Sequence, residues 1–359
     1  MGFKKPQITK VKTDIQSLSI YLRSVKKFGK TTLFRDLILE KFGDPAKGLL
    51  VGLGAEVGYS ILDNLNATQI EDWDDLEELK EWLITKKGKE HDIQIVAFDV
   101  IDELMPMAED QVIKMSRRET GKPCKSFNAA FGGYSEPRKR LMGLVKGFFT
   151  DLKKAGIMPF AISHTKIKSI KEKGEEGEGY HLLTSNLSND YEAIFGDIFD
   201  CVLTGYIDRE VSGGKIANET RKLFFRGNGY IDAGCRFASD TVPEYIVFDK
   251  PNMAKTFIDT LEEGLRKSRT KEMSKEEFKI EQEKEVVEIQ KKAEEFINKD
   301  EFVEYTVEVK QEKLDIIKIN LSKLDMAKIQ EIMVRYNVTS FNDAELVPSK
   351  CLDEILDLI

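Results

Sequence analysis

Short apolar runs alternate with amphipathic segments along the first 261 residues of the chain. Six runs have the length and composition of buried β-strands, namely Leu18–Leu22, Gly48–Leu53, Ile93–Phe98, Ile157–Ser163, Ile198–Leu203 and Lys222–Arg226. Apolar residues at helical spacing fill several intervals, as in Trp73–Thr85 and Arg138–Ala155. This alternation predicts an α/β domain with a mostly parallel central sheet. The turn at Ser212-Gly213-Gly214 predicts one late antiparallel hairpin, from Tyr206 to Phe225.

The pattern changes after Leu261. Residues 262–300 are mostly Lys and Glu with few apolar positions, which indicates a solvated, charged helical linker. Apolar spacing returns in residues 301–359 and predicts a small α-helical C-terminal domain. One helical face carries Ile329, Ile332, Met333 and Tyr336 before a stop at Asn337, and Pro348-Ser349 opens a second helix with Leu352, Ile355, Leu356 and Ile359. We expect such a module to bind a partner protein or another copy of the chain.

The net charge of −8 is concentrated in the last third of the chain. From Pro251 onward there are 25 acidic and 18 basic residues, so the first 250 residues carry a net charge of about −1. A nearly neutral core can still present a basic face, and the overall acidity therefore does not exclude nucleic acid.

Targeting signals and cysteine usage point to a cytoplasmic protein without a membrane partner. No apolar run is long enough for a transmembrane helix, and the N-terminus lacks both the apolar core of a signal peptide and the hydroxyl residue of a myristoylation signal. The cysteines (Cys124, Cys201, Cys235 and Cys351) are far apart and form no C-x-x-C pair. This spacing favours reduced thiols over disulfides or zinc.

The segment "SVKKFGKTT" carries the end of a phosphate-binding loop, Gly29-Lys30-Thr31-Thr32. An apolar strand precedes it and the amphipathic segment Thr31–Lys41 follows it, which is the strand–loop–helix context that such a loop requires. The signature has a glycine five residues before Gly29, where this chain has Ser24. Serine tolerates positive φ poorly, so Ser24 is expected either to distort the loop's entry and weaken ATP binding, or to be harmless.

We expect the loop from Ser24 to Thr32 to hold ATP and Mg²⁺. Gly29 allows close approach of the backbone, Lys30 reaches the β- and γ-phosphates, Thr31 binds Mg²⁺ through its hydroxyl, and Thr32 lies near the α-phosphate. Lys27 and Phe28 complete the set of loop residues expected to bind the nucleotide.

Polar residues at the ends of other strands complete the predicted site. Asp99 ends the apolar strand "IQIVAFD" at the carboxyl edge of the sheet, where it would be the second ligand of the metal, and Asp102 and Glu103 follow it. Glu56 follows the strand Gly48–Leu53 and would orient the attacking water. His164 ends the strand Ile157–Ser163, where it would sense the γ-phosphate.

The motifs "FGKTT", "AEVGY", "VAFDVIDEL", "GIMPFAISHTK" and "FFRGNGYIDAGCRF", in this order, resemble a RecA-like core. The resemblance covers about Ser17 to Leu261 and is to phage-encoded RecA-like P-loop ATPases, a group that includes single-strand annealing and recombination proteins. It implies the same ATP and Mg²⁺ ligands, with Glu56 as catalytic base and His164 as sensor. It also implies that Arg236 or Arg226 acts as a finger on the nucleotide of a neighbouring subunit.

The resemblance further implies single-stranded DNA binding by the loops after the Asp99 and His164 strands. In both loops basic residues accompany aromatic or flexible segments. The basic side chains would bind the phosphate backbone of DNA, and the aromatic rings would stack on its bases. The residues expected to contact DNA are Arg117, Arg118, Lys122, Lys125 and Tyr134 in the first loop and Lys166, Lys168 and Lys171 in the second.

The sequence therefore favours an ATP-dependent, oligomeric single-stranded DNA-binding protein of phage DNA metabolism, acting in the bacterial host cytoplasm. It would promote annealing or homologous recombination, and its C-terminal domain would recruit a partner such as a single-strand-binding protein. Two alternatives stay open. One is a motor of the hexameric helicase or helicase-loader type, and the other is a nucleotide-gated binding module with little hydrolysis.

Overall fold

The computed structural model describes residues 14–55, 60–171, 179–248 and 252–299, and residues 307–358 apart from short gaps. The chain forms two compact units, Met1–Glu294 and Glu295–Ile359. Among the described residues, no helix has the length and apolar character needed to cross a membrane.

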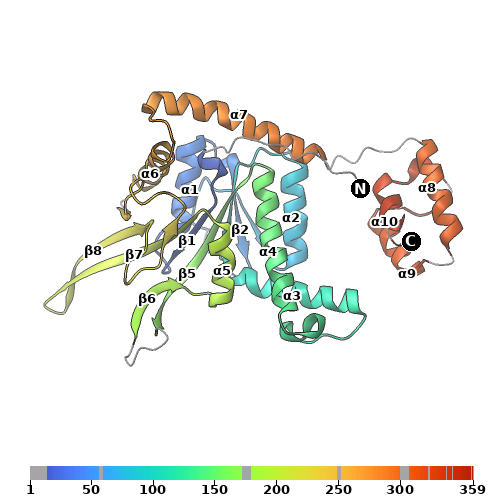
Figure 1. Cartoon of the computed structure of the whole chain (residues 1–359), viewed down its shortest axis with the longest axis horizontal. Helices are drawn as coiled ribbons and strands as arrows, with labels where there is room; N and C mark the ends of the chain where they lie inside the picture. Colours follow the sequence, from blue (N-terminus) through green and yellow to red (C-terminus); the bar gives the residue numbers. More distant parts are fainter. Residues whose placement is uncertain are drawn as a thin grey trace. The chain divides into compact units, whose positions relative to one another are not determined.

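The first unit is built on a mixed sheet whose central strands are parallel (Figure 1). The strand order is β10-β8-β7-β1-β5-β4-β2-β3, with β6 added antiparallel to β5 and β9 to β7. The strands are β1 (Ile20–Ser24), β2 (Gly48–Leu53), β3 (Ala67–Ile70), β4 (Ile95–Asp99), β5 (Met158–Ile170), β6 (Tyr180–Ser185), β7 (Cys201–Ser212), β8 (Lys215–Phe224), β9 (Gly234–Cys235) and β10 (Tyr245–Val247). Every residue of β1, β2 and β4 is buried, as expected when helices cover both faces of a parallel sheet.

Two groups of helices cover the sheet. Helix α1 (Lys30–Phe42) packs with α6 (Met253–Lys267), and their apolar residues form one core with the strands. The other group comprises α2 (Trp73–Thr85), α3 (Ile101–Thr120), α4 (Glu136–Lys154) and α5 (Asn189–Ile198). Its core is aromatic, with edge-to-face contacts of Phe148 and Phe149 against Phe98 at 5.3 Å.

The predicted α/β class with a mostly parallel sheet is confirmed. Helix α2 has the predicted bounds, and α4 lies within two residues of its prediction at the N-terminal end. The predicted late hairpin is β7–β8, closed by Gly213 and Gly214, which both have positive φ. The sequence did not reveal β3, β6, β9 and β10. Strands β3, β9 and β10 have four residues or fewer, and β6 begins with exposed polar residues.

Helix α7 (Lys275–Lys299) lies in the segment predicted as a solvated linker, yet much of it belongs to the first unit. Phe278 and Ala293 are buried on one face of α7. Arg269 forms ion pairs with Glu281 (3.1 Å) and Glu285 (2.8 Å) of the same helix. The division between the units therefore falls after Glu294, later in the chain than the predicted end of the core at residue 261.

The second unit is helical, with α8 (Val307–Asn320), α9 (Met326–Arg335) and α10 (Ser349–Leu356). The predicted faces of α9 and α10 form its core, in which Ile329, Ile332, Leu352 and Ile355 are buried. The predicted stop at Asn337 and the last apolar position, Ile359, lie outside the described residues. Short 3-10 helices span Ile15–Ser17, Pro45–Lys47, Phe127–Gly132 and Ala344–Leu346.

Candidate nucleotide site

The phosphate-binding loop connects the end of β1 to the start of α1. Gly29 is the N-cap of α1 with φ of 111°, and its carbonyl accepts the first helical hydrogen bond, from Leu33 N (2.8 Å). Lys27 also has a positive φ, of 63°. The first N–H groups of a helix lack partners within that helix, so the loop offers donors and a helix N-terminus to an anion.

Ser24 occupies the last position of β1, which is extended backbone and not a left-handed position. Its side chain is fully buried, and Gly205 of β7 lies beside it in register. A Cβ on Gly205 would come within 2.8 Å of the Ser24 Cβ. The position at which close packing requires a glycine is therefore Gly205 on β7 and not Ser24. The geometry thus gives no sign of the distortion that a positive φ at Ser24 would cause.

Phe28 turns its side chain away from the loop's open side and into the core. It is fully buried, stacks on Phe248 with ring centroids 4.7 Å apart, and also contacts Gly205. The Phe28 carbonyl accepts a hydrogen bond from Arg221 Nη1 of β8 (3.0 Å). The loop is therefore anchored on β7 and β8, a link that the sequence did not indicate.

Lys30 and His164 meet at the carboxyl edge of the sheet, since β1 and β5 are parallel neighbours with Ser24 opposite His164. Lys30 Nζ lies 3.3 Å from the carbonyl oxygens of Ser24 and Val25 and 3.4 Å from His164 Nδ1. Burial and the nearby Lys30 ammonium lower the pKa of His164 below its usual value. Which ring nitrogen carries the hydrogen depends on the tautomer, and an Nδ1 that accepts from the Lys30 ammonium leaves the hydrogen on Nε2.

The Nε2 atom of His164 is buried and has no hydrogen-bond partner among the described residues. Asp102 holds the part of β5 that carries His164. It accepts hydrogen bonds from Ser163 Oγ (2.7 Å), His164 N (3.2 Å) and Asn186 Nδ2 (3.1 Å). The sequence singled out Asp102 only as an acid that follows Asp99. Its several hydrogen bonds become visible only when the start of α3, strand β5 and the residue after β6 are brought together.

Thr31 and Asp99 form the oxygen pair predicted to hold the metal. The Thr31 hydroxyl donates to Asp99 Oδ2 at 2.9 Å, and Asp99 is only 7 % exposed. A hydroxyl and a carboxylate at the N-terminus of α1 suit a hard divalent cation that also binds phosphate oxygens. The residues present therefore fit the predicted metal site.

Other predicted catalytic residues are not brought to this site within one chain. Glu56 lies outside the described residues, two positions after Gly54 at the end of β2. Arg236 lies at the amino edge of the sheet, paired with Asp200 (3.2 Å) just before β7 begins. Arg226 donates to the carbonyl of Phe237 (2.9 Å), next to Arg236.

The candidate DNA-contacting residues lie at the end of α3, in the loop after it, and on the β5–β6 hairpin, which Figure 1 shows on the same side of the sheet. Arg117, Arg118, Lys122, Lys125, Lys166 and Lys171 are exposed, and Tyr134 is fully exposed. Two of the basic residues are partly engaged. Arg117 donates to the Cys124 carbonyl (2.7 Å), and Lys168 donates to the Leu187 carbonyl (2.8 Å) and to Asn189 Oδ1 (3.0 Å).

A buried ion network lies directly below the phosphate loop, and the sequence gave it no role. Arg23, which is fully buried in β1, contacts Glu192 (2.5 Å), Asp232 (3.0 Å) and Thr204 Oγ1 (3.1 Å). The Tyr21 hydroxyl donates to the same Glu192 carboxylate at 2.8 Å. The sequence did contain one indication of this network, because Arg23 stands in an otherwise apolar strand and a buried charge requires partners.

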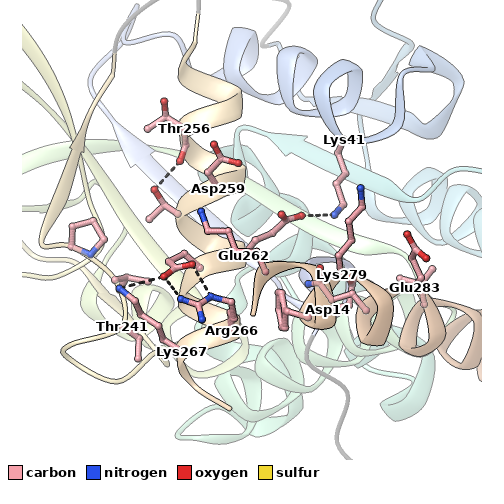
Figure 2. A pocket seen from close by; sticks show the side chains of 18 of the residues that line it. Asp14, Lys41, Thr241, Thr256, Asp259, Glu262, Arg266, Lys267, Lys279 and Glu283 are labelled. Carbon is pink, nitrogen blue, oxygen red and sulfur yellow. Dashed lines mark hydrogen bonds and ion pairs between the residues drawn. The ribbon is translucent and has the colours of Figure 1, made fainter. Parts of the chain in front are cut away.

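A cavity of about 1080 Å³ lies elsewhere, between α6, α7 and the end of α1 (Figure 2). Lys41 projects into it and pairs with Glu262 at 2.9 Å. Lys41 is eleven residues beyond Lys30 on α1, a rise of about 16 Å along the helix axis. This cavity is therefore separate from the phosphate loop.

Comparison with known proteins agrees with this geometry. A family profile described as an AAA domain matches residues 16–237, which is more than half of the chain and includes the loop, Asp99 and His164. The chain belongs to the AAA domain family. A search of curated proteins finds no match.

The AAA domain identifies a nucleotide-binding P-loop ATPase, a class that uses a divalent metal. In this AAA domain the loop from Ser24 to Thr32 and the Thr31–Asp99 pair are the elements that such an ATPase needs.

Proposed function

We propose that the chain is an ATP-dependent single-stranded DNA-binding protein that promotes annealing or homologous recombination. It would be of the kind that phages encode and would act in the bacterial host cytoplasm. The observation that carries the proposal is the continuity of β5, which runs without interruption from the nucleotide site at His164 to Lys166 and Lys168 on the β5–β6 hairpin. One rigid strand thus joins the predicted phosphate sensor to the predicted DNA contacts.

In this proposal Lys30 binds the β- and γ-phosphates of ATP, and Thr31 and Asp99 hold Mg²⁺. The metal would neutralise phosphate charge and position the γ-phosphate. A hollow of about 530 Å³ lined by Thr32 and Arg35 of α1 and by Asn252 and Lys255 lies beside the loop and has room for the nucleoside. His164 Nε2–H, which lacks a described partner, would donate to the γ-phosphate. Glu56 would orient the attacking water.

The exposed cations at the end of α3 and on the β5–β6 hairpin would contact the DNA backbone, with Tyr134 as a stacking platform. Lys122, Lys125 and Lys166 form no ion pair with a carboxylate in the part of the chain that the structure describes, which leaves them available for phosphates. ATP binding would order these segments, and hydrolysis would release the DNA.

Self-association completes the proposed site, because Arg236 lies at the opposite edge of the sheet from the loop of its own chain. It would act on the nucleotide of a neighbouring copy. The helical second unit would recruit a partner such as a single-strand-binding protein.

The test is ATP hydrolysis by the purified chain, measured with and without single-stranded DNA and across a Mg²⁺ titration. We expect turnover that rises with DNA and disappears in Lys30→Ala, and an Asp99→Asn variant that binds nucleotide but loses turnover. Asp110→Asn, an exposed acid on α3, is the matched control. Directional duplex unwinding would favour a helicase-type motor instead, and tight binding without turnover would favour a nucleotide-gated module.

A further inference from the structure

The guanidinium group of Arg221 reaches the phosphate loop from β8. Its Nη1 donates a hydrogen bond to the carbonyl of Phe28 at 3.0 Å. The backbone of Arg221 is held on both sides, because it lies opposite Ile207 of β7 and its carbonyl accepts a hydrogen bond from Phe248 N (2.7 Å). A strand fixed in the sheet thus presents a cationic donor to one backbone position of the loop.

The Phe28 carbonyl depends on this donor. Phe28 is fully buried, and its ring stacks on Phe248. Among the described residues, the hydrogen bond from Arg221 is the one that this carbonyl accepts. A buried carbonyl without a partner is costly, so removal of the Arg221 donor favours any movement that turns the carbonyl toward water or a polar group.

The same peptide group carries the Gly29 N–H. The bond between Phe28 and Gly29 is trans and planar, so its C=O and N–H point in opposite directions. Since the carbonyl is directed at Arg221, the Gly29 N–H is directed away from β8. It has no acceptor among the described residues and stands at the N-cap of α1. This N–H is therefore available to an anion that binds at the N-terminus of the helix.

The backbone of Gly29 does not fix this orientation by itself. Gly29 has φ of 111°, and glycine adopts positive and negative φ about equally well. Rotation of the Phe28–Gly29 peptide plane by half a turn would give Gly29 a negative φ and aim the Phe28 carbonyl at the anion. A carbonyl oxygen in that place repels a phosphate. The orientation that suits an anion is therefore maintained by a contact outside the loop.

We infer that Arg221 is a positioning residue of the nucleotide site, which directs the Gly29 N–H at the phosphates by holding the Phe28 carbonyl. The inference rests on the nucleotide binding in the proposed function and adds a residue of β8 to that site. Arg221 acts through the peptide group and does not itself touch the nucleotide. The N–H groups of such a loop bind the α- and β-phosphates, which ADP and ATP share. Loss of Arg221 should consequently weaken both nucleotides by the same factor.

Nucleotide affinity is the first measurement. Arg221→Met removes the donor and keeps an unbranched side chain, and we expect the affinities for ADP and ATP each to fall about tenfold, with their ratio unchanged. Arg209→Met is the matched control and should bind as wild type, because Arg209 lies on β7 of the same hairpin and pairs with Glu219 (2.9 Å), the acid that also lies near Arg221 (3.9 Å). Competition with a fluorescent nucleotide, in the absence of DNA, measures both affinities.

Nuclear magnetic resonance provides a second measurement on the full-length chain. Labelling of phenylalanine carbonyls with ¹³C and of glycine amides with ¹⁵N selects the four glycines that follow a phenylalanine, Gly29, Gly43, Gly132 and Gly196. Phe28→Leu deletes one of these pairs and thereby assigns the Gly29 signal. In Arg221→Met we expect the Phe28 carbonyl and Gly29 amide signals to move, because the carbonyl loses its hydrogen bond. Unchanged signals from the other three pairs would show that the variant is folded.

Three results would overturn the inference. The first is wild-type affinity for both nucleotides in Arg221→Met. The second is a loss confined to ATP, which would mean that the guanidinium contacts the γ-phosphate directly. The third is a set of Phe28 and Gly29 signals that do not move.

The resonance measurement needs neither nucleotide nor DNA. A wild-type chain that binds no nucleotide would contradict the proposed function. The Phe28 and Gly29 signals would still decide, in the same protein, whether Arg221 orients the loop. The failure of one is therefore distinguished from the failure of the other.

Discussion

The ammonium group of Lys30 lies 3.4 Å from Nδ1 of His164, so the first residue of α1 and the residue that follows the buried part of β5 share one site. In the tautomer whose Nδ1 accepts from the lysine, the ring hydrogen lies on Nε2 and points away from the lysine. It also links the phosphate loop to the strand that continues into the β5–β6 hairpin.

Replacing His164 should affect recognition of the γ-phosphate. In His164→Gln we expect the preference for ATP over ADP to fall by about tenfold to a hundredfold, the value of a hydrogen bond to a charged group. Competition binding with fluorescent nucleotides measures this ratio. His181→Gln, an exposed histidine on β6, should keep the wild-type preference. Equal preference in wild type and His164→Gln would show that the ring does not contact the γ-phosphate.

Restoring the signature glycine should bring little benefit. Ser24 lies in extended backbone and its side chain packs against Gly205, so Ser24→Gly relieves no strain. We expect nucleotide affinity to stay within about twofold and stability to fall by roughly 0.5–1 kcal/mol from the added chain entropy. Isothermal titration and thermal unfolding measure the two quantities. A large gain in ATP affinity would show that the serine impairs the loop.

Removing Arg23 should be costly, because it leaves two carboxylates without their buried partner. We expect Arg23→Gln to lower the free energy of unfolding by about 3–5 kcal/mol. The exposed pair Arg138–Asp190 (3.1 Å) provides the control, and Arg138→Gln should cost less than about 1 kcal/mol.

A double-mutant cycle tests whether Arg23 acts through Glu192. Arg23→Gln combined with Glu192→Gln should destabilise the chain less than the sum of the single changes. Each single change leaves the partner's charge buried and unpaired, whereas the double variant removes both charges. Additive effects in urea unfolding would mean that the ion pair contributes nothing.

Lys87 should make stability depend on alkaline pH. Its ammonium group is mostly buried and donates to the carbonyls of Ala155 (3.0 Å) and Gly156 (2.7 Å). Burial lowers the pKa of Lys87 to about 8, below its usual 10.5. Between pH 8 and pH 10.5 the side chain of Lys87 is protonated in the unfolded chain and mostly neutral in the folded chain. The free energy of unfolding therefore rises with pH over this range, and the gain is lost as the pH falls through about 8.

The measurement compares unfolding free energies at pH 8 and pH 10. Relative to Lys87→Met, the wild type should gain on the order of 2 kcal/mol over this range, and Lys86→Met on the exposed neighbour should behave as wild type. The comparison with Lys87→Met cancels the titration of tyrosines and cysteines common to both proteins. A flat difference would mean that Lys87 titrates as an ordinary lysine.

The two lysines of β5 should differ in their effect on DNA binding. Lys166 is exposed, whereas Lys168 is anchored to Leu187 and Asn189. Lys166→Ala should weaken single-stranded DNA binding and reduce the slope of log K against log salt by about 0.7, the value for one phosphate contact. Lys168→Met should keep the slope and lower the stability of the hairpin. Fluorescence anisotropy from 50 to 200 mM salt, a range over which phosphate contacts are readily resolved, separates the two.

Elements that are stabilised by residues near one another in the chain could be predicted from the sequence. The phosphate loop was recognised because strand, glycine and helix follow one another within 23 residues, from Ile20 to Phe42. Helix α2 was predicted with its observed bounds because its apolar periodicity is clear. Asp99 was placed at the carboxyl edge because an acid that ends an apolar strand of a parallel sheet can lie nowhere else.

Contacts between distant segments were decided only by the tertiary structure. Arg23 meets Glu192 across 169 positions, and Arg221 meets Phe28 across 193. No local pattern encodes which strands become neighbours, so neither pairing followed from the sequence. The sequence by itself determined the α/β class and the chemistry of the loop, because these depend on short-range periodicity and on residue type. The anchoring of that loop depends on strand order, which is set by packing the whole sheet.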